Sequence, residues 1–145
     1  MKFLPVLFFV FLSTLAHALP PNVVGVHIAS KHSAPGFNNE NKGVFLRWAD
    51  DAGAGFGGGV LQNSHEMTSA WSGYTFTSTG VTNLQARLEL TAGVITNYPL
   101  CKICPLLQVG ASAGFFKNNR VHFGWSPKVQ RDGASVTHLF ISHQF

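Results

Sequence analysis

The sequence predicts an all-β fold, an eight-stranded antiparallel transmembrane β-barrel, and three observations predict it. The chain begins with a segment typical of exported proteins. Charged residues make up only 11% of the chain and hydrophobic residues 46%, whereas typical soluble domains carry about 25% charged residues. After the first segment, short runs of apolar residues alternate with small and polar ones, and none is long enough for a membrane helix. A membrane-spanning barrel has this pattern, because its closed ladder pairs every backbone group that lipid cannot solvate.

The N-terminal segment has the three parts of a signal peptide. Lys2 gives a positive start, an apolar run follows over residues 3–15, and Ala16-His17-Ala18 has the small-x-small pattern of a cleavage site. The apolar run is about a dozen residues long, too short to cross a hydrocarbon core of about 30 Å as a helix. A retained interfacial anchor is the alternative. We therefore expect a signal peptide at 1–18, one barrel domain at 19–145, and export to the bacterial outer membrane.

Eight segments are predicted to be strands, because apolar residues alternate within them and turn residues separate them. They are Val23–Ser30, Gly43–Ala49, Phe56–Gln62, Ala70–Phe76, Leu84–Ile95, Pro105–Ala113, Val121–Ser126 and Val136–Phe145. Eight strands of this length fit a small barrel with a lipid-facing outer surface. A barrel in water would instead carry charge on the outer face of most strands. The last segment ends on Phe145, and a terminal aromatic residue is typical of outer-membrane barrels.

The candidate catalytic residues lie toward the end of the barrel that is expected to face outward. His27 is on the first strand, and Ser64 is in the connection after the third. Histidine can act as a general base near neutrality, and a serine hydroxyl can attack an ester carbonyl or polarise it. Two strand spacings, about 10 Å, separate these strands, so a loop can bring the two side chains together. His32 and His65 are also near the outer end, and either could be the base instead.

Several fragments occur in the order and at the spacing of a known family. They are Val26–Ala29, Phe37–Asn41, Gln62–Ser64, Ser72–Tyr74, Thr91–Val94, Pro105–Leu107, Ser126–Pro127 and Gln144–Phe145. With them, the chain from Val23 to Phe145 resembles the lipid A palmitoyltransferase family (PagP). The resemblance implies an eight-stranded outer-membrane barrel with an acyl pocket in its upper half. It also implies an acyltransferase that moves a palmitoyl-like chain from a phospholipid to lipid A.

The resemblance also implies roles for individual residues. His27 and Ser64 fall on catalytic positions of the family, and Asn63 falls where the family has Asp. Asn can orient a neighbour or donate to an oxyanion, but it cannot stabilise an imidazolium as a carboxylate does. Gly73 and Thr75 fall beside the acyl pocket of the family and are expected to bind the acyl chain. Because Thr75 is close to a position where the family has a small residue at the pocket floor, a chain shorter than palmitoyl is expected to fit best.

The expected function is therefore acyl transfer to lipid A or a related envelope glycolipid, by a monomer without cofactor, metal or nucleic acid. An acyl hydrolase, with water as the acceptor, is the first alternative. A non-catalytic structural barrel is the second, and Asn63 favours it. The net charge of +4 is too small for a nucleic-acid-binding stripe. Five basic residues of the outward connections are placed to contact phosphates of lipopolysaccharide: Lys31, Lys42, Lys102, Lys128 and Arg131.

Two further expectations concern the barrel's stability. Arg87 and Glu89 share a face of their strand and are predicted to form an internal ion pair, with Arg47 in the same network. Cys101 and Cys104 form a C-x-x-C segment, and the exported context favours a small loop-closing disulfide between them.

Overall fold

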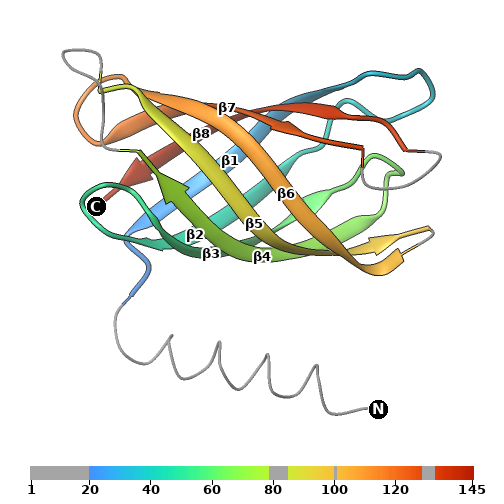
Figure 1. The fold of residues 1–145 in the computed structure, drawn as a ribbon, viewed down its shortest axis with the longest axis horizontal. Helices are drawn as coiled ribbons and strands as arrows, with labels where there is room; N and C mark the ends of the chain where they lie inside the picture. The colour runs from blue at the N-terminus through green and yellow to red at the C-terminus, as the bar shows by residue number, and fades with distance from the viewer. Residues whose placement is uncertain (1–19, 79–84, 100, 129–132) are drawn as a thin grey trace, which may run out of the picture.

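The computed structural model describes residues 20–78, 85–99, 101–128 and 133–145, which form a closed antiparallel β-barrel (Figure 1). Its strands are β1 (Val23–His32), β2 (Gly43–Ala49), β3 (Gly55–Gln62), β4 (Thr68–Thr77), β5 (Arg87–Tyr98), β6 (Cys101–Gly114), β7 (Asn119–Ser126) and β8 (Val136–Gln144). Each strand pairs with the next in the chain, and β8 closes the barrel on β1. The predicted eight-stranded antiparallel barrel is confirmed. The predicted signal peptide lies outside the described residues.

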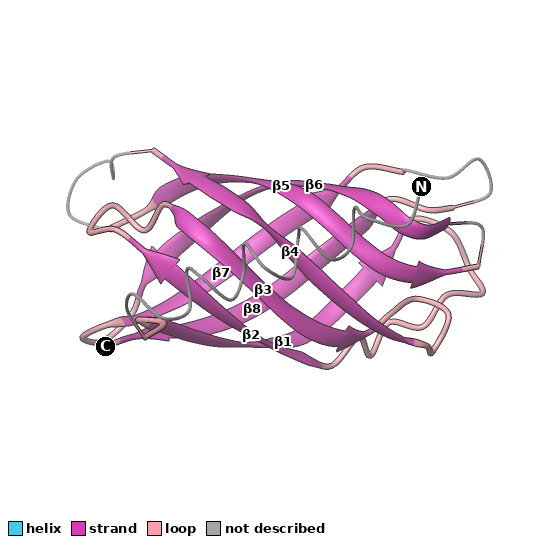
Figure 2. Ribbon diagram, turned by 90° about the horizontal axis from the view of Figure 1, so that it is seen from below, coloured by secondary structure: helices cyan, strands magenta, loops and turns pink. Residues whose placement is uncertain are grey.

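The strands are strongly tilted, and the barrel has two distinct ends (Figure 2). The connections after β1, β3, β5 and β7 leave at one end, which we call the loop end. The opposite end, the turn end, holds the start of β1 and the end of β8, because Val23 pairs with Gln144. Among the described residues, no helix has the length and hydropathy needed to cross a membrane.

The largest error in the predicted strand bounds lies at the loop end. β1 continues past Ser30 to His32, and β6 begins at Cys101 rather than at Pro105. Polar residues and cysteines at these places suggest loops, but the ladder continues through them, with Cys101 opposite Tyr98. The barrel wall is therefore taller at this end than the alternation of apolar residues predicts.

The outer surface of the barrel is largely apolar, and much of its interior is polar. Large hydrophobic side chains are exposed on the outer faces of β1 to β7, among them Val26, Val44, Leu46, Val60, Phe76, Leu88, Leu90, Ile103, Val109, Phe123 and Trp125. Buried polar residues face the interior, among them His27, Arg47, Ser72, Thr75, Thr91, Ser112, Arg120, His122 and Ser142. This arrangement is the reverse of that in a soluble protein, where burial selects apolar side chains.

A charged network fills the interior near the turn end. Glu89 accepts hydrogen bonds from Ser112 Oγ at 2.7 Å and from His122 Nδ1 at 2.9 Å. His122 Nε2 lies 2.8 Å from the Ser142 hydroxyl. The predicted ion pair of Glu89 with Arg87 is wrong, because the Arg87 guanidinium lies outside this network and donates to the carbonyl of Asp51 at 3.1 Å. The partner of Glu89 is therefore His122 of β7 and not Arg87, which lies on the same strand as Glu89.

Candidate functional site

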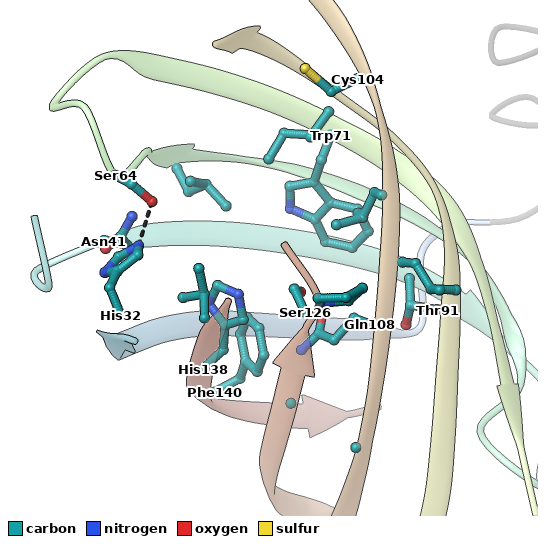
Figure 3. Close-up of a pocket in the computed structure, with 18 of the residues that line it drawn as sticks. His32, Asn41, Ser64, Trp71, Thr91, Cys104, Gln108, Ser126, His138 and Phe140 are labelled. Atoms are coloured by element: carbon teal, nitrogen blue, oxygen red, sulfur yellow. Dashed lines mark hydrogen bonds between the residues drawn. The ribbon is translucent and has the colours of Figure 1, made fainter. Parts of the chain in front are cut away.

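A cavity of about 150 Å³ lies inside the barrel, and its walls change along its length (Figure 3). Near the loop end the lining is polar and includes His32, Asn41, Ser64, His65 and Tyr98. Apolar side chains of the lining come from β2 to β8 and include Phe45, Trp71, Ile95, Leu106 and Phe140. Polar and charged side chains line it again toward the turn end and include Arg47, Glu89, Thr91, Gln108 and His122. Figure 3 shows Ser64 and Thr91 at opposite ends, with Trp71 between them.

At the loop end, Ser64, His32 and Asn39 form a hydrogen-bonded chain. The hydroxyl of Ser64 donates to Nε2 of His32 at 2.5 Å (Figure 3). Nδ1–H of the same ring donates to Oδ1 of Asn39 at 2.8 Å. The acceptor at Nδ1 fixes the tautomer that leaves Nε2 unprotonated, ready to take the serine proton. This is the order of nucleophile, base and orienting group found in serine and cysteine hydrolases, with an amide in the third place.

A β-bulge in β1 turns His32 into the barrel. The pairing of β1 with β8 shifts between His27 and Ala29, so Ile28 is an extra residue in the ladder. In a regular strand, residues five apart point to opposite faces. The bulge changes the phase, and both His27 and His32 are buried, at 6% and 9% exposure. His32 therefore reaches Ser64 from inside the wall.

The connection between β1 and β2 is held against the barrel by its asparagines. Oδ1 of Asn39 also accepts from the backbone N–H of His32 at 3.1 Å, and its carbonyl accepts from the N–H of Ser30 at 3.0 Å. Asn41 is 2% exposed and accepts from the hydroxyl of Ser30. The backbone N–H of Asn38 donates to the carbonyl of Ser64 at 3.0 Å. This segment therefore positions both the base and the nucleophile.

Asn63 precedes Ser64 in the connection between β3 and β4, and its side chain makes four hydrogen bonds there. It is 0% exposed, and its amide N–H groups donate to Ser69 Oγ at 2.9 Å and to the carbonyl of Asn97 at 2.8 Å. Its Oδ1 accepts from the backbone N–H groups of His65 and Met67. Asn63 therefore shapes the turn that presents Ser64, and no hydrogen bond joins its side chain to His32.

His27 lies deeper in the barrel and contacts a different partner. Its Nδ1–H donates to the carbonyl of Asn41, so its Nε2 accepts from Nδ1–H of His138 at 3.0 Å. His27 also packs edge-on against Phe140, with ring centroids 4.7 Å apart. The structure thus brings His32, one of the alternatives that the sequence left open, into contact with Ser64, and it does not bring His27 there.

Aromatic residues surround the Ser64–His32 pair. Phe37 stacks on the His32 ring, with centroids 5.2 Å apart and planes 19° from parallel. His65 packs edge-on against Phe37 and against Tyr98. Tyr98 lines the cavity together with Ser64, which makes its hydroxyl a candidate donor for an oxyanion. Sequence analysis singled out neither Asn39 nor Tyr98, although the Asn-rich segment at 38–41 was a signal for the first.

The two residues expected to bind an acyl chain lie in β4, outside the set that lines the cavity. Gly73 pairs with Gly57 and Gly93, where a Cβ atom would lie 2.6 Å from the carbonyl oxygen of Ala92. Thr75 is 1% exposed, and its hydroxyl lies 2.9 Å from that of Thr91. Thr91 lines the cavity, and Thr75 lies behind it as its hydrogen-bond partner.

The cavity also reaches the outer surface between β6 and β7. In the described chain, β7 pairs with β6 only from Val109 to Gly114, so the half of β6 toward the loop end lacks a partner on that side. The cavity lining includes Leu107 and Phe123, which point outward and are 44% and 58% exposed. Pro105 of this half strand has no N–H to donate. Among the described residues, therefore, no strand closes the wall beside this half of β6.

Cys101 and Cys104 are both thiols, so the predicted disulfide is absent from the structure. They lie in one extended strand, opposite Tyr98 and Ile95. Three residues of a strand span about 10 Å, whereas a disulfide needs Cα atoms within about 7 Å. In the part of the chain that the structure describes, no three His, Cys, Asp or Glu side chains lie close enough to hold a metal ion.

The site can therefore supply a nucleophile with its base and orienting group, an oxyanion donor, an apolar cavity and a lateral opening. We compared the chain with models of known protein families and with curated proteins, and neither comparison found a match.

Proposed function

We propose that the protein is an outer-membrane acyltransferase that moves an acyl chain from a phospholipid to lipid A or a related envelope glycolipid. The observation that carries the proposal is the hydrogen-bonded chain of Ser64, His32 and Asn39 at the mouth of the cavity. The reaction begins when Ser64 Oγ attacks the ester carbonyl and its proton passes to His32 Nε2. The resulting imidazolium protonates the leaving lysophospholipid oxygen, and the acyl chain stays on Ser64 as an ester.

In the second half of the reaction, His32 removes the proton of a glycolipid hydroxyl, which attacks the acyl-serine. Collapse of this second tetrahedral intermediate returns the proton to Ser64. The Tyr98 hydroxyl is the donor for both oxyanions. Asn39 holds the imidazole by a neutral hydrogen bond, so it orients the base without adding the charge stabilisation of a carboxylate.

The distribution of polarity supports a membrane location. Outward side chains such as Leu46, Val60 and Leu88 are 44%, 48% and 69% exposed. An exposed apolar surface that extends around a barrel indicates contact with lipid rather than with water. The closed ladder satisfies the backbone groups that lipid cannot solvate.

The lateral opening supports a membrane lipid as the acyl donor. A chain that enters between β6 and β7 passes Leu107 and Phe123 on the outside and meets Leu106 and Phe140 in the cavity. Burial of methylene groups there is favourable by about 0.8 kcal/mol each. The reacting ester then lies toward the loop end, which is where Ser64 and His32 meet.

The basic residues of the loop end favour a phosphorylated glycolipid as the acceptor. Lys31, Lys42, Lys102 and Lys128 are exposed, and Lys42 has one exposed ion pair, with Glu40 at 3.4 Å. If water reaches the acyl-serine first, the same machinery is an acyl hydrolase, which is the second candidate function.

Mass spectrometry of envelope lipids tests the proposal. The full chain and its Ser64→Ala variant are expressed in the outer membrane of a strain without lipid A acyltransferase activity. We expect lipid A heavier by one acyl chain, together with lysophospholipid, for the parent, and neither product for the Ser64→Ala variant. Lysophospholipid or free fatty acid without heavier lipid A would support the hydrolase. If the parent protein is correctly inserted and the lipids are unchanged, the protein is a non-catalytic barrel.

A further inference from the structure

Arg47 carries a buried guanidinium that makes no hydrogen bond with any described residue. The residue is 8% exposed, and its Nε is buried without a partner. Its described interactions are contact with the Phe45 ring, 5.7 Å from Cζ, and long-range attraction to Glu89. No salt bridge joins it to Glu89, whose oxygens are taken by Ser112 and His122. An unpaired buried charge is unfavourable unless a partner enters the site.

Arg47 lines the cavity, and other polar groups of the lining are also unpaired. Ser126 Oγ is buried without a partner, and the Gln108 amide makes no hydrogen bond with the described residues. Gly124 leaves the room for this amide, because a Cβ atom there would lie 1.6 Å from Gln108 Nε2. Figure 3 shows Gln108 far from the Ser64 end of the cavity. The cavity lining therefore has unpaired polar groups besides Arg47, and Gln108 among them lies away from the proposed catalytic serine.

We propose that the cavity holds a second site, for a free medium-chain fatty acid whose carboxylate pairs with Arg47 and whose chain lies along Phe45, Trp71 and Phe140. The planar guanidinium matches a carboxylate, with two parallel N–H donors. A monoanion neutralises the single charge of Arg47. A phosphate dianion would add a net negative charge close to Glu89, which disfavours it. The site needs no step of the proposed acyl transfer, since neither Ser64 nor His32 contacts the carboxylate.

Quenching of tryptophan fluorescence by 10-bromodecanoate tests this site. The refolded full chain carries Ser64→Ala, so no turnover disturbs the binding signal, and it stays in one nonionic detergent throughout. The pH is held where the carboxylic acid is ionised. Trp71 lines the cavity, so saturable quenching must disappear in a Trp71→Phe variant. The neutral match is 10-bromodecanol, which has the same chain and bromine.

We expect the acid to bind at least about tenfold more tightly than the alcohol, because a charge-assisted pair with Arg47 adds to the same apolar contact. Arg47→Gln should weaken the acid by a similar factor and leave the alcohol unchanged, while Arg47→Lys should have an intermediate effect. Arg87→Gln is the matched control, because Arg87 is outside the cavity lining and donates to the carbonyl of Asp51.

Equal binding of acid and alcohol to the protein that retains Arg47 would overturn the site, and this comparison needs no Arg47 variant to fold. Tighter binding of 10-bromodecyl phosphate than of the acid would overturn the carboxylate as the ligand. Acyl transfer is tested separately, by mass spectrometry of the lipids. Failure of fatty-acid binding and failure of acyl transfer can therefore be distinguished.

Discussion

The hydroxyl of Ser64 donates to the imidazole of His32 at 2.5 Å, across a separation of 32 residues in the chain. Both side chains are buried, at 6% and 9% exposure. The contact depends on a bulge in β1, which turns His32 inward, and on Asn63, which shapes the turn before Ser64. If the protein is an acyltransferase, these two residues define where the acyl group is held.

The base can be identified by comparing two histidine variants. His32→Ala should reduce acyl transfer about a thousandfold or more, since Ser64 loses its proton acceptor. His27→Ala should retain most activity, because His27 is hydrogen-bonded to Asn41 and His138 rather than to Ser64. Lipid A modification is measured in membranes with equal amounts of folded barrel. The reverse result would assign the base to His27, as the family resemblance implies.

Replacing two asparagines by aspartate should have opposite effects. Asn39→Asp should raise the rate, because a carboxylate at Oδ1 accepts from His32 Nδ1–H as before and also stabilises the imidazolium. Asn63→Asp should instead destabilise the barrel by about 1–3 kcal/mol, because a carboxylate cannot donate to Ser69 or Asn97. Initial rates of transfer and urea unfolding are measured on both variants. Activation by Asn63→Asp would contradict the loop role assigned to Asn63.

The barrel fold could be predicted from the sequence because outward side chains recur with a period of two along a strand. Leu88 and Leu90 of β5 show this period, and both point outward. The bulge could not be predicted, because Ile28 is as suitable for a regular strand as for an extra residue. Regular alternation from His27 would put His32 on the outer face, so the site depends on a feature without a sequence signature.

The partners of the candidate serine were also beyond sequence analysis, because they come together only through tertiary structure. Asn39 reaches His32 because backbone hydrogen bonds hold its connection against Ser30 and Ser64. Tyr98 approaches Ser64 because β5 continues past the predicted end at Ile95. Residue type suggested Ser64 and a histidine, and the choice among histidines required the packing of the loop end.

The cysteines should behave as two independent thiols. Cys101 and Cys104 are in one extended strand and are not joined by a disulfide. We expect maleimide to label both thiols after unfolding without reductant, and dithiothreitol to leave the unfolding midpoint unchanged. Labelling of both thiols only after reduction would show that a disulfide forms and that this strand rearranges to make it.

Stability should depend on Glu89 much more than on Glu40. Glu89 is the shared acceptor of Ser112 and His122 inside the barrel, and its side chain is 13% exposed. Glu89→Ala leaves both donors buried without an acceptor, so we expect a loss of about 3 kcal/mol in the free energy of unfolding. Glu40→Ala is the matched control, because the Glu40–Lys42 pair is largely exposed, at 77% and 76%, and such pairs contribute below about 1 kcal/mol. Urea unfolding of both variants in lipid vesicles, followed by tryptophan fluorescence, gives the difference. Equal losses would mean that the interior network adds no more to stability than a surface pair, and His122 would then be free to serve a ligand of the cavity.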